Sequence, residues 1–174
     1  LIGVGMTGIG SGTILKYDLD VAAKVANDAN EHYAKLLGIN KAARVTTIKP
    51  SGTTSCVLGT SSGIHAWHND YYIRRMQCTK DEELYKYLAK AHPELVADMK
   101  MMPNSAVVEI PQKAPASSIL RNEETALELL ERIKLFNLSW VRPGHRTGDN
   151  TNNVSATVSI KDNEWKEVGD WMWT

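Results

Sequence analysis

The residues with the clearest chemical potential lie between positions 45 and 55. A β-branched run over residues 45–48 passes through Lys49 and Pro50 into a glycine flanked by small hydroxyl residues. At the end of such a strand, free backbone N–H groups and side-chain hydroxyls suit an anion, most often a phosphate. The candidate phosphate-binding residues are Ser51, Gly52, Thr53, Thr54 and Ser55. A Ser/Thr-rich turn that merely caps a helix is the alternative, and the residues by themselves leave both interpretations open.

Two neighbouring patterns have a weaker chemical meaning. The segment is not a Walker P-loop, because GxxxxGKS/T is absent and Lys49 precedes the glycine. Residues 3–8 match GxGxxG, but a dinucleotide site needs a strand directly before the motif and a helix at its last glycine. Because the next helix is expected only near Asp18, the pattern favours a tight glycine turn over a nicotinamide or flavin site.

The cysteines and histidines give no catalytic or metal-binding pattern. Cys56 and Cys78 form neither a disulfide framework nor a CxxC pair, which indicates a reducing, intracellular setting. No histidine lies near Cys56 in a nucleophile pattern, so a buried structural thiol is expected there. His65, His68 and His145 lack a third ligand at a metal-binding spacing, which favours surface or hydrogen-bonded histidines.

Charge and hydropathy narrow the class of protein. Lys plus Arg and Asp plus Glu both number 20, so a net charge that would favour nucleic acid is absent. No apolar run reaches the roughly 20 residues of a membrane span. The chain opens at Leu1 without a methionine and ends in an apolar segment, Trp171-Met172-Trp173, so we expect a piece of a longer protein.

Strand and helix patterns alternate along the chain, which predicts an α/β class. Strands are expected at residues 44–49, 71–77, 106–110 (ended by Pro111) and 153–160. Helices are expected from Asp18 to Gly38 and over 81–91, 94–99, 122–141 (capped by Asn122) and 162–173. The apolar stripe of the first helix comprises Val21, Val25, Ala29, Tyr33, Leu36 and Leu37. Arg74 and Arg75 share one strand, so at most one of them can serve the anion site.

Several motifs occur in a fixed order and together resemble a known family. They lie at residues 49–55, 58–65 and 72–75, with further motifs at 3–9, 143–146 and 150–159. The set closely resembles the ribonucleotide reductase large chain, specifically the adenosylcobalamin-dependent class II enzymes of the ribonucleoside-triphosphate reductase type. The likeness runs over nearly all of the chain.

This resemblance implies a fold and a chemistry. The family fold is a ten-stranded α/β barrel, of which residues 1–174 would be a single fragment. The family converts ribonucleoside di- or triphosphates to 2′-deoxyribonucleotides by thiyl-radical chemistry, with adenosylcobalamin as the radical source and a thioredoxin-type reductant, in the cytoplasm. In this family a loop of small hydroxyl residues binds the substrate's terminal phosphates. By the resemblance, this role falls here on Ser51, Gly52, Thr53, Thr54 and Ser55.

The resemblance also implies what this chain lacks. The radical and redox cysteines are expected outside residues 1–174, so the fragment should be inactive without the remaining reductase segments. A catalytically silent nucleotide- or phosphate-binding module is the alternative. The motifs do not distinguish a diphosphate from a triphosphate substrate.

Overall fold

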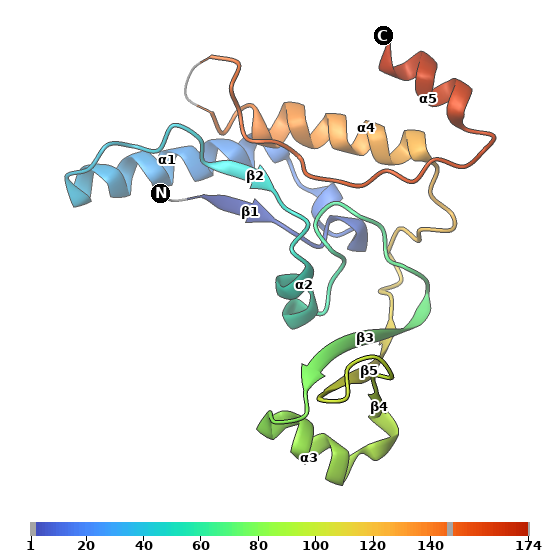
Figure 1. Ribbon diagram of the computed structural model, residues 1–174. Helices are drawn as coiled ribbons and strands as arrows, with labels where there is room; N and C mark the ends of the chain where they lie inside the picture. Colours follow the sequence, from blue (N-terminus) through green and yellow to red (C-terminus); the bar gives the residue numbers. More distant parts are fainter. Residues whose placement is uncertain (1–2, 146–147, 174) are drawn as a thin grey trace. The chain divides into compact units, whose positions relative to one another are not determined.

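The computed structural model describes residues 3–145 and 148–173, and it divides into two compact units (Figure 1). The first unit combines Leu1–His68 with Pro115–Thr174, and the second is Asn69–Ala114. None of the helices within the described ranges is long and apolar enough to cross a membrane.

The first unit is built on parallel strands. Strand β1 (Val4–Met6) pairs with β2 (Thr46–Ile48), and Val154 adds a parallel bridge to Ile48 on the other side. Helix α1 (Leu19–Leu37) connects the two strands, which makes a β–α–β unit (Figure 1). The predicted α/β class is confirmed.

Helix α1 begins and ends where the sequence indicates. The Asp18 carboxylate accepts a hydrogen bond from the Val21 amide at 3.0 Å, and Gly38 ends the helix in the left-handed conformation at φ 64°. The prediction that the apolar stripe of α1 faces the core is nevertheless wrong. The large members of the stripe are exposed, whereas the buried positions are Leu19, Ala23, Asn30 and Ala34. The small alanine side chains permit close packing of the helix against the core. Hydropathy alone does not predict that alanines form the buried face.

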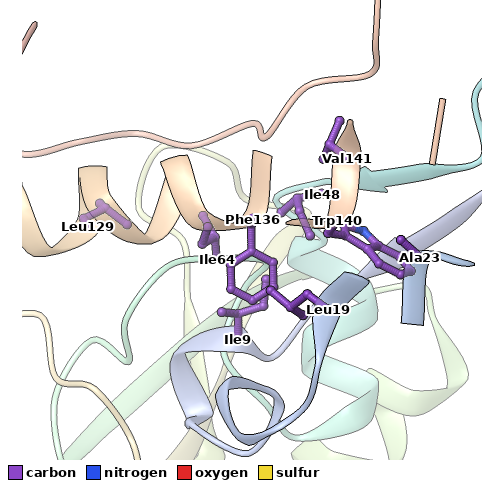
Figure 2. Packing of buried hydrophobic residues seen from close by; sticks show 9 residues of the cluster. All are labelled: Ile9, Leu19, Ala23, Ile48, Ile64, Leu129, Phe136, Trp140 and Val141. Atoms are coloured by element: carbon purple, nitrogen blue, oxygen red, sulfur yellow. The ribbon is translucent and has the colours of Figure 1, made fainter. Parts of the chain in front are cut away.

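Helix α4 (Ala126–Phe136) forms the other side of the core (Figure 2). It starts at Thr125 instead of Asn122, because Thr125 and Glu128 form a capping box: the Glu128 amide donates to Thr125 Oγ1 at 3.2 Å and the Thr125 amide donates to Glu128 Oε2 at 2.7 Å. A π-helical turn, Asn137–Val141, follows. The cluster in Figure 2 comprises Ile9, Leu19, Ala23, Ile48, Ile64, Leu129, Phe136, Trp140 and Val141.

The prediction of a strand over residues 153–160 is wrong, because this segment forms no regular β-strand. It makes an isolated bridge at Val154, with the Ser155 amide donating to the Ile48 carbonyl at 3.2 Å. Asn152 adds a side-chain bond to the Thr46 carbonyl at 2.9 Å. The segment therefore follows β2 without a continuous ladder. The last helix, α5 (Trp165–Met172), lies within the range predicted for it.

The second unit is an antiparallel sheet with one helix, in the order β3-β5-β4. Its elements are β3 (Tyr71–Thr79), α3 (Glu83–Ala91), a 3₁₀ turn (Pro93–Leu95), β4 (Val96–Asp98) and β5 (Ser105–Lys113). The helix expected over 94–99 is therefore wrong. Pro111 also does not end β5: β4 pairs only as far as Val108, so Pro111 lies where β5 has a free edge, and sheets tolerate proline at edges.

Candidate phosphate-binding site

The predicted phosphate-binding residues open a short helix, α2 (Gly52–Leu58), which follows β2 (Figure 1). Ser51 precedes it in the left-handed conformation, at φ 51° and ψ 44°, the one non-glycine residue with positive φ in the described ranges. The Ser51 hydroxyl donates to the Lys49 carbonyl at 3.2 Å and does not cap the helix. A strained residue at this position indicates that the surrounding structure imposes the conformation.

The first turn of α2 presents hydrogen-bond donors to solvent. Gly52, Thr53 and Thr54 are exposed, and in this turn an α-helix leaves its amides without an intrahelical acceptor. Within the described residues none of these three amides donates elsewhere. Ser55 differs: it is fully buried, its amide donates to the Ser51 carbonyl at 2.9 Å and its hydroxyl donates to the Gly52 carbonyl at 3.0 Å. Ser55 therefore stabilises the turn from behind.

A return loop over residues 59–65 supports the entry to α2. Gly59 ends α2 with φ 59°, and Ser62 donates through its hydroxyl to the Pro50 carbonyl. Gly63 has φ 56°, and a Cβ atom there would overlap the Lys49 carbonyl oxygen. Only glycine permits the return loop to approach the backbone this closely.

The glycine-rich segment before α1 holds the return loop in place. The Gly8 amide donates to the Ser61 carbonyl at 3.0 Å, the Ile9 amide donates to the Gly63 carbonyl at 3.0 Å, and the Gly63 amide donates to Thr7 Oγ1 at 2.9 Å. Within the GxGxxG match at residues 3–8, the expected tight turn occurs at Gly8, with φ 75°. Residues 4–6 of the same match form strand β1 and not a turn. The motif thus acts here as a scaffold for the residues that follow α2.

Sequence reasoning missed Ser11, which joins several parts of this scaffold. It is buried, and its hydroxyl oxygen lies 2.8 Å from Thr60 Oγ1 and 3.2 Å from the Ser61 amide that donates to it. The Trp67 indole N–H donates to the same oxygen at 2.8 Å. A lone serine between glycines gives no signal for this role, because its partners lie about 50 residues away.

The histidines behave as expected for surface or hydrogen-bonded residues. His65 Nδ1 lies 3.0 Å from the Ser62 carbonyl, and its Nε2 accepts from the Thr157 amide at 3.0 Å, so both ring nitrogens have a backbone partner. His145 Nε2 lies 2.7 Å from the Gly148 carbonyl, and His68 is exposed. In the described parts of the chain, no three potential ligands form a metal-binding group. Arg146, part of the motif at 143–146, lies outside those parts.

The cysteines and the arginine pair complete the predicted candidates. Cys56 is half-buried with its Sγ 2.9 Å from the Gly52 carbonyl, so the expectation of a buried thiol is wrong: position 56 lies on a partly exposed face of α2. Cys78 lies on β3, where burial raises the pKa of its thiol, with a smaller contribution from the Glu82 carboxylate. Arg74 is half-buried on β3, and Arg75 pairs with Glu109 at 2.7 Å. Whether either arginine serves the α2 site stays a prediction, since both belong to the second unit.

The known proteins that are similar in sequence share one enzyme name. The chain is 32% identical over 137 residues to a Dictyostelium discoideum protein named as a probable adenosylcobalamin-dependent ribonucleoside-triphosphate reductase. It is 27% identical over 150 residues to the Lactobacillus leichmannii enzyme and 28% identical over 146 residues to the Euglena gracilis enzyme, both named as adenosylcobalamin-dependent ribonucleoside-triphosphate reductases. These matches cover 79%, 86% and 84% of this chain. No family model matches.

A solved structure has a similar fold. A crystal structure of a B12-dependent, class II ribonucleotide reductase matches 98% of this chain with a TM-score of 0.76, at 21% sequence identity. The chain spans only 17–20% of the length of the curated relatives above and 27% of that solved chain. By sequence, the chain is similar to part of the adenosylcobalamin-dependent ribonucleoside-triphosphate reductases, and it shares the fold of part of a class II ribonucleotide reductase.

Proposed function

We propose that this chain supplies the substrate phosphate-binding part of an adenosylcobalamin-dependent ribonucleoside-triphosphate reductase. The observation that carries the proposal is the first turn of α2, where the amides of three exposed residues and the hydroxyls of Thr53 and Thr54 are available after a parallel strand. Phosphate oxygens accept hydrogen bonds from such donors. The relatives' names supply the substrate class, a ribonucleoside triphosphate.

The five residues would divide the work. Gly52 has open space where a Cβ would lie, so an anion can reach the backbone closely. Thr53 and Thr54 would add hydroxyl donors. Ser51 sets the direction of the first amides through its left-handed conformation, and Ser55 holds the turn through the Gly52 carbonyl. Because α2 has only seven residues, directed hydrogen bonds would contribute more than its dipole.

The remaining chemistry of the proposed reductase lies with other segments. Binding of the triphosphate would hold the ribose in position for reduction at its 2′ carbon. Binding energy from the phosphates would in this way contribute to the orientation of the reacting group. Adenosylcobalamin would supply the radical, and a thioredoxin-type partner in the cytoplasm the reducing equivalents. The donors at residues 51–55 fit an oxyanion and not a corrin ring, so no step through the cofactor is assigned to this chain.

The proposal is tested by binding. We expect the Ser51→Ala/Thr53→Ala variant to lose about tenfold or more in affinity for a ribonucleoside triphosphate, since hydrogen bonds to charged groups contribute about 1.5–3 kcal/mol. Thr13→Ala is the matched control, because Thr13 is an exposed hydroxyl residue of the same unit whose side chain makes no capping bond. Isothermal titration calorimetry on the 174-residue chain measures both. Equal affinities in the double variant and the control would contradict the assignment.

A nucleotide- or phosphate-binding module without catalysis is the second candidate. The observation in its favour is that donors for an anion are present at α2, whereas Cys56 and Cys78 each lie against a carbonyl oxygen, at 2.9 and 3.7 Å. Turnover of a ribonucleoside triphosphate, after addition of the remaining reductase segments, adenosylcobalamin and a dithiol, separates the two. The reductase requires turnover under these conditions, and the binding module predicts none.

A further inference from the structure

Two buried charges lie beside the return loop. Arg132 on α4 pairs with Glu124, and their side chains are only 8% and 7% exposed. The Nη2 atom of Arg132 and the Oε1 atom of Glu124 are fully buried, and neither makes a further hydrogen bond within the described residues. The two charges pair with each other, and removing either one alone would leave its buried partner without this pairing.

The same guanidinium also contacts the return loop. Arg132 Nε donates to the Ile64 carbonyl at 3.3 Å, and the Ile64 side chain is fully buried in the core shown in Figure 2. Glu124 fixes one end of the planar group while Nε points at the loop. A single planar side chain with donors in fixed directions can make both contacts together.

From Ile64 the connection continues to the entry of α2. Gly63 directly precedes Ile64 and lies against the Lys49 carbonyl, and the Ser62 hydroxyl donates to the Pro50 carbonyl. Pro50 is bonded to Ser51, whose left-handed conformation directs the first amides of α2. The backbone that carries the donors is thus supported from behind by residues 62–64.

We propose that Arg132 is a positioning residue for the α2 site, which acts through the Ile64 carbonyl and the return loop. The inference rests on the proposed phosphate-binding function. A buried ion pair adds little stability compared with apolar residues of similar volume. What it supplies here is a directed donor to one backbone carbonyl, which an apolar side chain cannot provide.

The test separates this role from general stability. The variant Arg132→Met/Glu124→Leu removes both charges together, so no unpaired charge remains, and Arg121→Met is the control because Arg121 is an exposed arginine of the same unit. Hydrogen exchange, followed by mass spectrometry or NMR on the 174-residue chain, reports residues 50–65. Calorimetric titration with inorganic tripolyphosphate reports the anion site without a base or sugar.

We expect the double variant to unfold at a urea midpoint close to that of the control, to exchange faster over residues 50–65 and to bind tripolyphosphate roughly 2- to 30-fold more weakly. If the double variant does not fold, Arg132→Lys serves in its place. Lysine has a methylene group where arginine has Nε, so the donor to the Ile64 carbonyl is removed while the ammonium can still pair with Glu124, and the same local loss is expected.

Each other outcome has a definite meaning. Unchanged exchange over residues 50–65, or exchange that rises only in step with a global loss of stability, overturns the inference. Unchanged affinity in the variant, with a wild-type chain that binds, overturns it while leaving the proposed function standing. A wild-type chain that does not bind tripolyphosphate overturns the proposed function, and the positioning role with it.

Discussion

Replacing Gly63 by alanine should destabilise the first unit far more than the same change at Gly59. Both glycines are left-handed, at φ 56° and 59°, so each alanine bears about 1–2 kcal/mol of backbone strain. They differ in their surroundings. A Cβ at Gly59 meets no atom within 4 Å, whereas a Cβ at Gly63 overlaps the Lys49 carbonyl and lies 3.2 Å from Pro50 Cα.

The difference gives the expected magnitudes. Relief of the overlap at Gly63 requires a backbone shift of the overpacking kind, which costs about 1–3 kcal/mol more. We therefore expect losses in the free energy of unfolding of about 1–2 kcal/mol for Gly59→Ala and about 2–5 kcal/mol for Gly63→Ala. Because the displaced atoms belong to Lys49 and Pro50, the affinity of α2 for tripolyphosphate should also fall in Gly63→Ala.

Urea unfolding followed by tryptophan fluorescence measures this effect. All five tryptophans lie in the first unit, at positions 67, 140, 165, 171 and 173, so the signal reports that unit and not residues 69–114. Equal losses in the two variants would show that the close approach to Lys49 does not constrain the loop. That result would refute the account of how residues 59–65 support α2.

Three further predictions concern helix capping and local electrostatics. Thr125→Ala should lower the free energy of unfolding by about 1 kcal/mol in the same assay, because the α4 capping box is lost. Hydrogen bonds from the Thr125 backbone and then its side chain lower the pKa of Glu128, so the carboxylate stabilises the fold above its ordinary pKa of 4.5 and this contribution is lost as the pH falls through the folded-state pKa. Glu128→Gln should therefore differ from wild type most at neutral pH and least in acid, and a pH-independent difference would contradict this. Burial, and secondarily Glu82, raises the pKa of Cys78, so in a Cys56→Ser background its alkylation by iodoacetamide should begin at higher pH in the folded than in the urea-unfolded chain.

Local signals predicted the helix boundaries that depend on local chemistry. Asp18 and Gly38 bound α1 because a carboxylate cap and a left-handed glycine act within one turn of the helix. Asn122 was the wrong cap for α4, since Thr125 has Glu128 three residues later and completes a reciprocal pair. The outward stripe of α1 shows the limit of hydropathy: Val21 and Val25 are 57% and 62% exposed, whereas Ala23 is fully buried.

The sequence by itself determined the α/β class, the order of the motifs and their resemblance to ribonucleotide reductases. It also indicated that residues 51–55 could hold an anion, because small hydroxyl residues and a glycine after a strand are a local pattern. Only the tertiary structure decided where each of these residues lies: Ser55 points inward, and Gly52, Thr53 and Thr54 remain exposed. The supports come from Ser11, Gly63 and Arg132, which are up to 121 positions apart in the chain and become neighbours of one loop only when the chain folds.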